Sequence, residues 1–255
     1  MNLGWKKWLY IVSPFVILLI IWGMVTNFGL IKPFFLPSPI KVFEAGINLF
    51  AQNNFISDIF ISLFRILIGF MIGVVLAIPA GLLIGLNKKA EMTLEPLIDF
   101  IRYTPIPAFV PLLILWVGIG ELEKIIIISA SVFFQLALMV ANSVSQTPED
   151  MLLFGQTLGL SKIEIVFKII FPFSWPRIID DMRISLGWAW SGLLIAEIVG
   201  STAGIGFVII QSQRLLKTEN VIFAIIVVGI LGIFFDWLSK IIQKSLFPWF
   251  KKSLL

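Results

Sequence analysis

The chain has 255 residues, of which 59% are hydrophobic and only 13% are charged, with a formal net charge of +4. Soluble domains are about half apolar and a quarter charged, so this composition excludes an ordinary soluble protein and indicates a membrane protein. The chain has no cysteine and no histidine, which excludes disulfides, thiol nucleophiles and histidine-based metal or acid–base chemistry. Because each membrane-spanning helix needs ~20 residues, we expect residues 1–255 to form one all-α polytopic domain with about six spans.

The first apolar stretch covers residues 8–28 and follows Lys6 and Lys7. It predicts a first span whose basic end lies in the cytoplasm. A targeting peptide is the less favoured alternative, since no small-residue cleavage site follows. The next segment, residues 36–50, is amphipathic and is expected to lie outside the membrane, with Ser38 capping its helix.

Residues 56–86 form the predicted second span. Because a charge inside a membrane is costly, Arg65 is expected either to extend outward to the interface or to pair with a neighbour. Four glycines in this span include two small-xxx-small spacings, which let helix backbones approach closely in lipid. They are Gly69, Gly73, Gly81 and Gly85.

The predicted third span, residues 91–120, is irregular. Glu95, Asp99 and Arg102 share one helical face, which cannot face lipid. Three prolines then interrupt the helix, and broken helices in membranes are tolerated where they are buried or line a cavity. A packing kink and a transport pathway are therefore both open for this segment. The prolines are Pro105, Pro107 and Pro111.

The remaining spans are predicted at residues 125–144, 178–200 and 219–242, with residues 121–124 as an outer turn before the first of them. In this topology eleven lysines and arginines fall in cytoplasmic segments and five in outer ones. Positive charge concentrates on the cytoplasmic side of membrane proteins, so both termini are expected in the cytoplasm.

A polar segment, residues 147–176, separates the fourth and fifth spans and predicts two short helices joined by a sharp turn. Thr147 is the expected cap of the first helix, which should end at Gly159, because glycine tolerates the left-handed conformation found past helix ends. Ser161 and Glu164 form a capping-box pattern for the second helix. Two prolines are expected to stop that helix, namely Pro172 and Pro176.

The spacing T-L-G-x-S-(x)10-P-(x)3-P over residues 157–176 resembles the EAA loop of binding-protein-dependent ABC importer permeases. In that family the loop lies in the cytoplasm and its first helix sits in a groove of the ATPase subunit. Where the family usually has Glu-Ala-Ala, this chain has Leu153, Phe154 and Gly155. The runs R-x-x-P-x-P-x-x-x-P from Arg102 and R-(x)5-A-W from Arg183 are similar to the nitrate/sulfonate/taurine branch.

The resemblance implies a type I ABC importer permease fold in a bacterial inner membrane. It implies a subunit that forms the translocation pathway for a small solute, such as nitrate, bicarbonate or a sulfonate, by alternating access. The implied partners are a second permease copy, two cytoplasmic ATPase subunits and an extracytoplasmic binding protein, with no nucleic acid. The chain contains no Gly-Lys dipeptide and hence no G-x-x-x-x-G-K-[ST] phosphate loop. ATP and Mg are therefore expected on the partner ATPase, and no catalytic, cofactor or metal site in this chain.

Two sets of candidate site residues follow. The predicted ATPase-docking residues are Met151, Phe154, Gly155, Thr157, Leu158, Gly159, Ser161 and Glu164. The predicted substrate-pathway residues are Thr104, Pro105, Ile106, Trp188, Ser191 and Glu197. An acid within a span is a functional candidate, so Glu197 either gates the outer end or only anchors the structure, by lying at the headgroup level or by pairing with a basic residue. A self-sufficient secondary transporter or channel is the main alternative, and an integral-membrane enzyme is less favoured.

Overall fold

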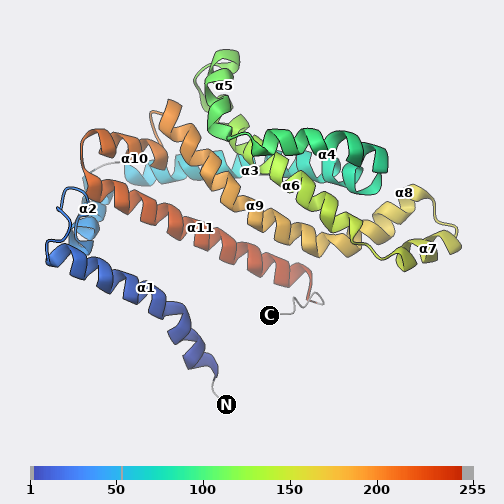
Figure 1. Ribbon diagram of the computed structural model, residues 1–255, viewed down its shortest axis with the longest axis horizontal. Helices are drawn as coiled ribbons and strands as arrows, with labels where there is room; N and C mark the ends of the chain where they lie inside the picture. Colours follow the sequence, from blue (N-terminus) through green and yellow to red (C-terminus); the bar gives the residue numbers. More distant parts are fainter. Residues whose placement is uncertain (1–2, 53, 249–255) are drawn as a thin grey trace.

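The computed structural model describes residues 3–52 and 54–248, and every regular element in these ranges is a helix (Figure 1). The first half contains α1 (Leu3–Asn27), α2 (Pro39–Gln52), α3 (Phe55–Leu86), α4 (Lys88–Tyr103), the 3-10 turn η1 (Ile106–Phe109) and α5 (Val110–Val117). The second half contains α6 (Glu121–Ser145), α7 (Glu149–Thr157), α8 (Lys162–Ile165), the π-helical turn η2 (Val166–Ile170), α9 (Phe171–Gly200), α10 (Ile205–Arg214) and α11 (Thr218–Leu246).

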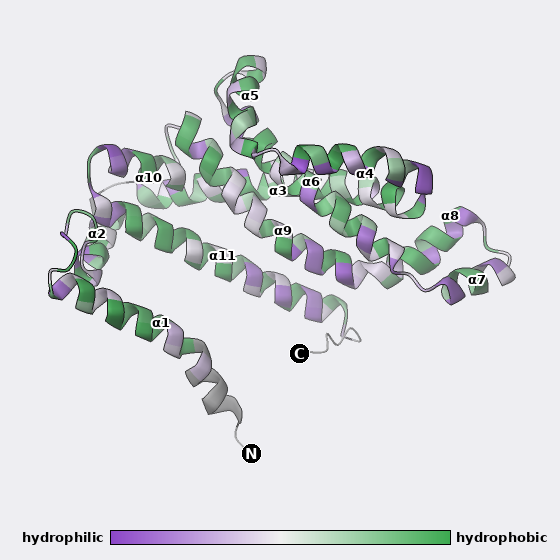
Figure 2. Cartoon of the chain, in the orientation of Figure 1, coloured by the Kyte–Doolittle hydropathy of each residue, from purple (hydrophilic) through white to green (hydrophobic). Residues whose placement is uncertain are grey.

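Four continuous helical segments in the described ranges are long and apolar enough to cross a membrane, namely α3, α6, α8 through α9, and α11. The pair α4 and η1–α5 makes a fifth if it is counted as one broken span. The remaining predicted span corresponds to α1, in which Val12–Asn27 is a shorter apolar helix. Figure 2 shows the long helices as mostly hydrophobic, with hydrophilic residues more frequent toward their two ends, near α2 and α10 and near α7 and α8.

The centre of the bundle is the contact between α3 and α6. The glycines of α3 face α6 directly: a Cβ atom added at Gly81 would lie 2.6 Å from the carbonyl oxygen of Ala137. A Cβ at Gly85 would lie equally close to the carbonyl oxygen of Ala141. The two backbones approach closely only because these positions carry no side chain, as the small-residue spacing predicts.

The third predicted span is broken, as its prolines indicate. Helix α4 ends at Tyr103, and the η1–α5 segment then turns away at 89°. Figure 1 shows α5 projecting from the bundle above α6. Pro105 precedes η1 and Pro107 lies within it, where proline cannot continue the α-helical hydrogen bonds.

Two sequence-based boundaries are wrong. Residues 121–124, predicted as a turn, form the first turn of α6. Acidic side chains are favourable there, because the amino end of a helix carries a partial positive charge, and Glu121 and Glu123 supply them. The second error is that Pro172 and Pro176 do not end the preceding helix. Helical backbone continues from Lys162 to Gly200, with Pro172 in the first turn of α9 and Pro176 inside it.

We expect Gly81→Ala to lower the free energy of unfolding by about 1–3 kcal/mol, because an added methyl in a closely packed contact forces the backbones apart. The matched control is Gly229→Ala in α11, where a Cβ meets nothing within 4 Å. Thermal unfolding of both purified variants in one detergent checks this. Equal stability of the two variants would contradict close α3–α6 packing at Gly81.

Candidate functional site

Helices α7 and α8 form a hairpin, hereafter the α7–α8 hairpin, that projects from one end of the bundle (Figure 1). Its turn is fixed by Gly159, whose φ of +73° is in the left-handed region, as predicted. Ser161 and Glu164 form the predicted capping box, and Glu164 also pairs with Lys168 at 2.7 Å. The predicted cap of α7 is one residue off: Pro148 occupies that position. The Thr147 hydroxyl instead donates to the carbonyl oxygen of Val144.

The α7–α8 hairpin presents apolar side chains to its surroundings. Phe154 is 64% exposed and Leu158 is 62% exposed, and Met151 is partly exposed beside them. Among the predicted docking residues Gly155 differs, because it is buried and a Cβ there would lie 2.5 Å from Cδ1 of Ile169. Gly155 therefore lets α7 pack on η2, whereas Phe154 and Leu158 are free to contact a partner. Thr157 is exposed, and its hydroxyl donates to its own helix.

The α7–α8 hairpin is joined to a long span without a break, since η2 leads directly into α9. A π-helical turn changes the hydrogen-bond register, and such turns are frequent at functional sites. The carbonyl oxygen of Pro176, inside α9, accepts a hydrogen bond from Nε2 of Gln243 on α11. This bond joins α9 to α11 beside the proline. The carbonyl oxygen that Pro176 leaves without its helical donor is that of Pro172, four residues earlier in the first turn of α9.

A cavity of about 450 Å³, hereafter the central cavity, lies between η1, the adjoining ends of α4 and α5, and the facing sides of α6 and α9. Five of the six predicted pathway residues line it together, although they come from two distant parts of the sequence. They are Thr104, Pro105, Ile106, Trp188 and Ser191. The sixth, Glu197, lies outside this set and is described below.

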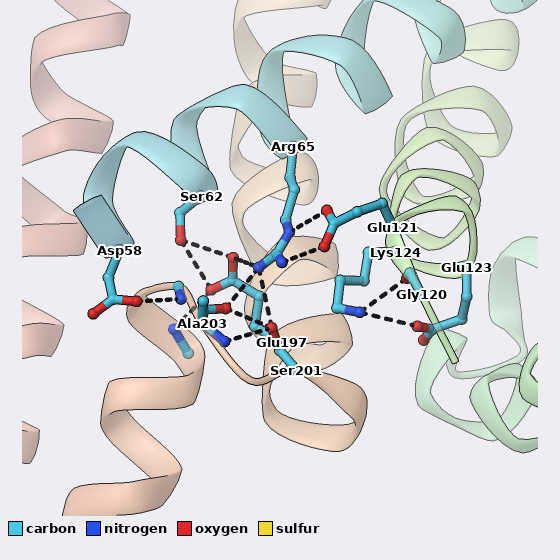
Figure 3. A network of polar contacts seen from close by, with 12 residues as sticks. Asp58, Ser62, Arg65, Gly120, Glu121, Glu123, Lys124, Glu197, Ser201 and Ala203 are labelled. Atoms are coloured by element: carbon cyan, nitrogen blue, oxygen red, sulfur yellow. Dashed lines mark hydrogen bonds and ion pairs between the residues drawn. The ribbon is translucent and has the colours of Figure 1, made fainter. Parts of the chain in front are cut away.

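Glu197 lies near the end of α9 that is far from the α7–α8 hairpin (Figure 1) and belongs to a polar network (Figure 3). Its carboxylate is fully buried and accepts hydrogen bonds from Nη1 of Arg65 at 2.9 Å and from the Ser62 hydroxyl at 2.7 Å. Arg65 also binds the Glu121 carboxylate through Nε at 2.7 Å and Nη2 at 2.5 Å. The structure therefore shows Arg65 paired with neighbours, one of its two predicted fates.

The network also holds the start of α10. The backbone N–H of Gly206 donates to Glu197 at 2.8 Å, and that of Gly204 donates to Asp58 at 2.7 Å. The N–H groups of a helix's first turn have no partner within the helix, so carboxylates there satisfy them and complement the helix dipole. Three spans and α10 are thereby joined through Arg65 and Glu197.

The sequence prediction did not identify Ser62, Asp58 or Glu121 as members of this network. One signal was present: Asp58, Ser62 and Arg65 follow the i, i+4, i+7 spacing and so share a face of α3. Glu121 lies in the predicted outer turn, a position that gives no reason to expect it beside Arg65. A second buried pair adjoins the network, in which Nζ of Lys124 lies 3.7 Å from Glu123 and donates to the carbonyl oxygen of Gly120 (Figure 3).

We expect Glu197→Gln to lower the free energy of unfolding by about 3–5 kcal/mol, because it removes one partner of a buried ion pair. Glu121→Gln is the matched comparison, since the Glu121 side chain also binds Arg65 but is 56% exposed. Solvent screens that pair, so its loss should cost about 1 kcal/mol or less. Thermal unfolding of the two variants tests the order, and a larger loss in Glu121→Gln would contradict it.

Comparison with known proteins adds the family. The family described as binding-protein-dependent transport system inner membrane component matches residues 69–248. The taurine transport system permease protein TauC of Escherichia coli (strain K12) is 30% identical over 243 residues, covering 93% of this chain and 88% of that protein. The nitrate import permease protein NrtB of a Synechocystis species is 29% identical, with 84% of this chain and 81% of that protein covered.

Among solved structures, inward-facing conformations of the MetNI methionine ABC transporter match with a TM-score of 0.68 and 18% identity. The match covers 74% of this chain and 94% of the other chain. At this identity the likeness concerns the fold, and it agrees with the all-helical bundle described above. The chain thus has a type I ABC importer permease fold and belongs to the family of binding-protein-dependent transport system inner membrane components.

Proposed function

We propose that this chain is the membrane-spanning subunit of an ATP-driven importer for a small anion of the taurine, sulfonate or nitrate kind. The observation that carries the proposal is the α7–α8 hairpin. Its first helix, α7, exposes apolar side chains and is fixed at both ends. Its second helix, α8, leads without a break into α9, a span that lines the central cavity. The solute class rests on the relatives, which are named for taurine and nitrate transport.

The partners proposed are a second copy of this permease, two cytoplasmic ATPase subunits and an extracytoplasmic binding protein. An aromatic side chain as exposed as Phe154, on a helix outside the spans, favours a protein partner that covers it. The absence of a phosphate-loop motif from the sequence agrees with ATP and Mg binding on a separate subunit. In this arrangement the α7–α8 hairpin and both termini face the cytoplasm, and the Glu197 network faces outward.

The mechanism proposed is alternating access. Closure of the ATPase subunits displaces the α7–α8 hairpin, and α9 carries this displacement to Trp188 and Ser191 in the wall of the central cavity. The network around Glu197 joins the outer end of α9 to α3 and α6, so it can hold that end closed while the cytoplasmic end opens. In this mechanism Glu197 helps to close the outer entrance of the pathway but is not part of the pathway's lining.

We expect Phe154→Ala to weaken ATPase binding by roughly 30-fold, since truncating an interface anchor often costs ~2 kcal/mol or more. Purification with the ATPase, followed by measurement of retained complex and ligand-stimulated ATP hydrolysis, checks this. The matched control is Phe60→Ala on α3, which truncates a phenylalanine of similar exposure outside the hairpin. Full retention of the ATPase by Phe154→Ala would contradict docking at this residue.

Gly159→Val should misorient α7, because a β-branched residue is strained at a φ of +73°. Gly159→Asn is the control, since asparagine enters the left-handed region more readily. Both variants should insert in the membrane, and only Gly159→Val should lose transport or uncouple ATP hydrolysis. Normal coupling in both Gly159→Val and Phe154→Ala would mean that the hairpin is an ordinary connector.

A further inference from the structure

The charge of the central cavity is set by one residue. Among the described residues that line it, Arg102 is the only ionisable one, and the walls are otherwise apolar apart from a few hydroxyl, amide and indole groups. Arg102 is paired with Asp99, which does not line the cavity, so the wall presents the positive partner of this ion pair. That side of the pair favours an anion inside the cavity over a cation.

The guanidinium of Arg102 is only partly used by its neighbours. Nη2 donates to the Asp99 carboxylate at 2.7 Å, and the group lies 5.0 Å from the centre of the Tyr103 ring. Its Nε–H is buried and has no hydrogen-bond partner among the described residues. Because protein encloses that atom, it does not itself reach a ligand in the cavity. Nη1 makes no hydrogen bond to any residue in the described ranges and is not enclosed, so the Nη1 edge of the guanidinium is the one available to a ligand. Guanidinium groups bind planar or tetrahedral oxyanions through paired N–H donors.

A second polar group in the cavity is also available. Gln135 lies in the middle of α6 and lines the cavity, and its side-chain amide makes no hydrogen bond to any residue in the described ranges. The hydroxyls beside it are already used as donors. Ser131 donates to the carbonyl oxygen of Ile127 at 2.7 Å, and Ser191 donates to that of Gly187 at 3.2 Å. The Gln135 amide therefore offers N–H donors that those hydroxyls cannot.

We propose that the central cavity binds the transported oxyanion, with Arg102 and Gln135 as the groups that recognise its oxygens. This inference rests on the proposed import function and deepens it. A volume of about 450 Å³ with largely apolar walls suits an oxyanion that carries a short apolar body, such as an alkyl sulfonate. Selection against cations follows because the cavity wall presents the guanidinium of the Arg102–Asp99 pair and not the carboxylate. The amide of Gln135 adds directed N–H donors without adding charge.

The test uses a single cysteine, because the chain has none of its own. The cysteine is placed at Ser191, which lines the cavity and is exposed. Permease in membrane vesicles is treated with two thiosulfonate reagents of similar size, one carrying a sulfonate and the other a quaternary ammonium. The reference is Gln156→Cys on the exposed surface of α7. We expect the ratio of sulfonate to ammonium labelling rates to be about tenfold higher at Ser191→Cys, equivalent to ~1.4 kcal/mol.

Substitutions at the two recognition groups should change this ratio in different ways. Arg102→Gln should lower it to the value at Gln156→Cys, whereas Arg102→Lys, which keeps the charge, should retain most of it. Gln135→Glu should lower the ratio more than Gln135→Leu, because it adds a negative charge inside the cavity. Controls are Lys244→Gln, an exposed cation on α11, and Asn142→Leu, an exposed amide two turns along α6, and both should leave the ratio unchanged.

Competition identifies the ligand class. Ethanesulfonate added in excess should slow labelling of Ser191→Cys when Arg102 is intact and should have no effect with Arg102→Gln. An unchanged ratio in Arg102→Gln would overturn the proposal. So would a lack of reaction at Ser191→Cys with either reagent, which would mean that a second copy or lipid fills the cavity. Failure of the proposed ATPase docking would be seen in a different experiment, as full retention of the ATPase by Phe154→Ala. That result would leave the anion preference of the cavity intact.

Discussion

The close approach of α3 and α6 is the constraint on which the other features depend. Between helices in lipid, apolar burial contributes little, because the lipid chains are as apolar as leucine. Contact is gained where glycine removes the side chain, as at Gly81 and Gly85 against α6. The same packing brings Arg65 of α3 beside Glu121 at the start of α6. The α3–α6 pair thereby forms one wall against which α9 packs. The polar network is built on that wall, and α6 and α9 also line the central cavity.

The polar network adds specificity to this packing. Burying ions is costly, and a buried ion pair often stabilises a fold no better than apolar residues would. Arg65 recovers much of that cost because its nitrogens reach Glu121, Glu197 and the carbonyl oxygen of Ala203. Each of these partners requires its helix to be at one depth and one rotation. A slide of α9 along α6 by a single turn would separate Glu197 from Arg65 and Ser62 while Arg65 stayed paired with Glu121, so the network fixes the register of α9 relative to α3 and α6.

The features that the sequence predicted correctly are those that depend on residues close together in the chain. Hydrophobic runs located the spans, small-residue spacing located the α3 contact, and the capping box with Gly159 located the hairpin turn, because each pattern acts within a few residues. The network could not be found in this way, since Arg65 is 56 residues from Glu121 and 132 from Glu197. Acidic residues at 121–124 suggested a solvated turn, whereas they begin a helix beside Arg65. The prolines at the end of the hairpin suggested a stop, but the helical backbone continues through them from the π-helical turn into α9. The sequence places Arg102 on a polar face of the third span, but only the fold brings it into one cavity with Gln135 of α6.

The helical backbone is uninterrupted from Lys162 to Gly200, so one long segment, hereafter the lever, connects the hairpin, the central cavity and the polar network. Its 39 residues extend roughly 58 Å at a rise of ~1.5 Å per residue, which is longer than the hydrocarbon core of a bilayer. One end of this lever is the α7–α8 hairpin, its middle lines the cavity at Trp188 and Ser191, and its far end carries Glu197. The π-helical turn at Val166–Ile170 is its least regular part, and the Arg65 bond to Glu197 lies near its far tip. If the helix rotates about the end held at Glu197, a force applied at the hairpin acts at the greatest distance from that pivot. The residues of the cavity wall, which lie nearer the pivot, then move by only a fraction of the hairpin's displacement.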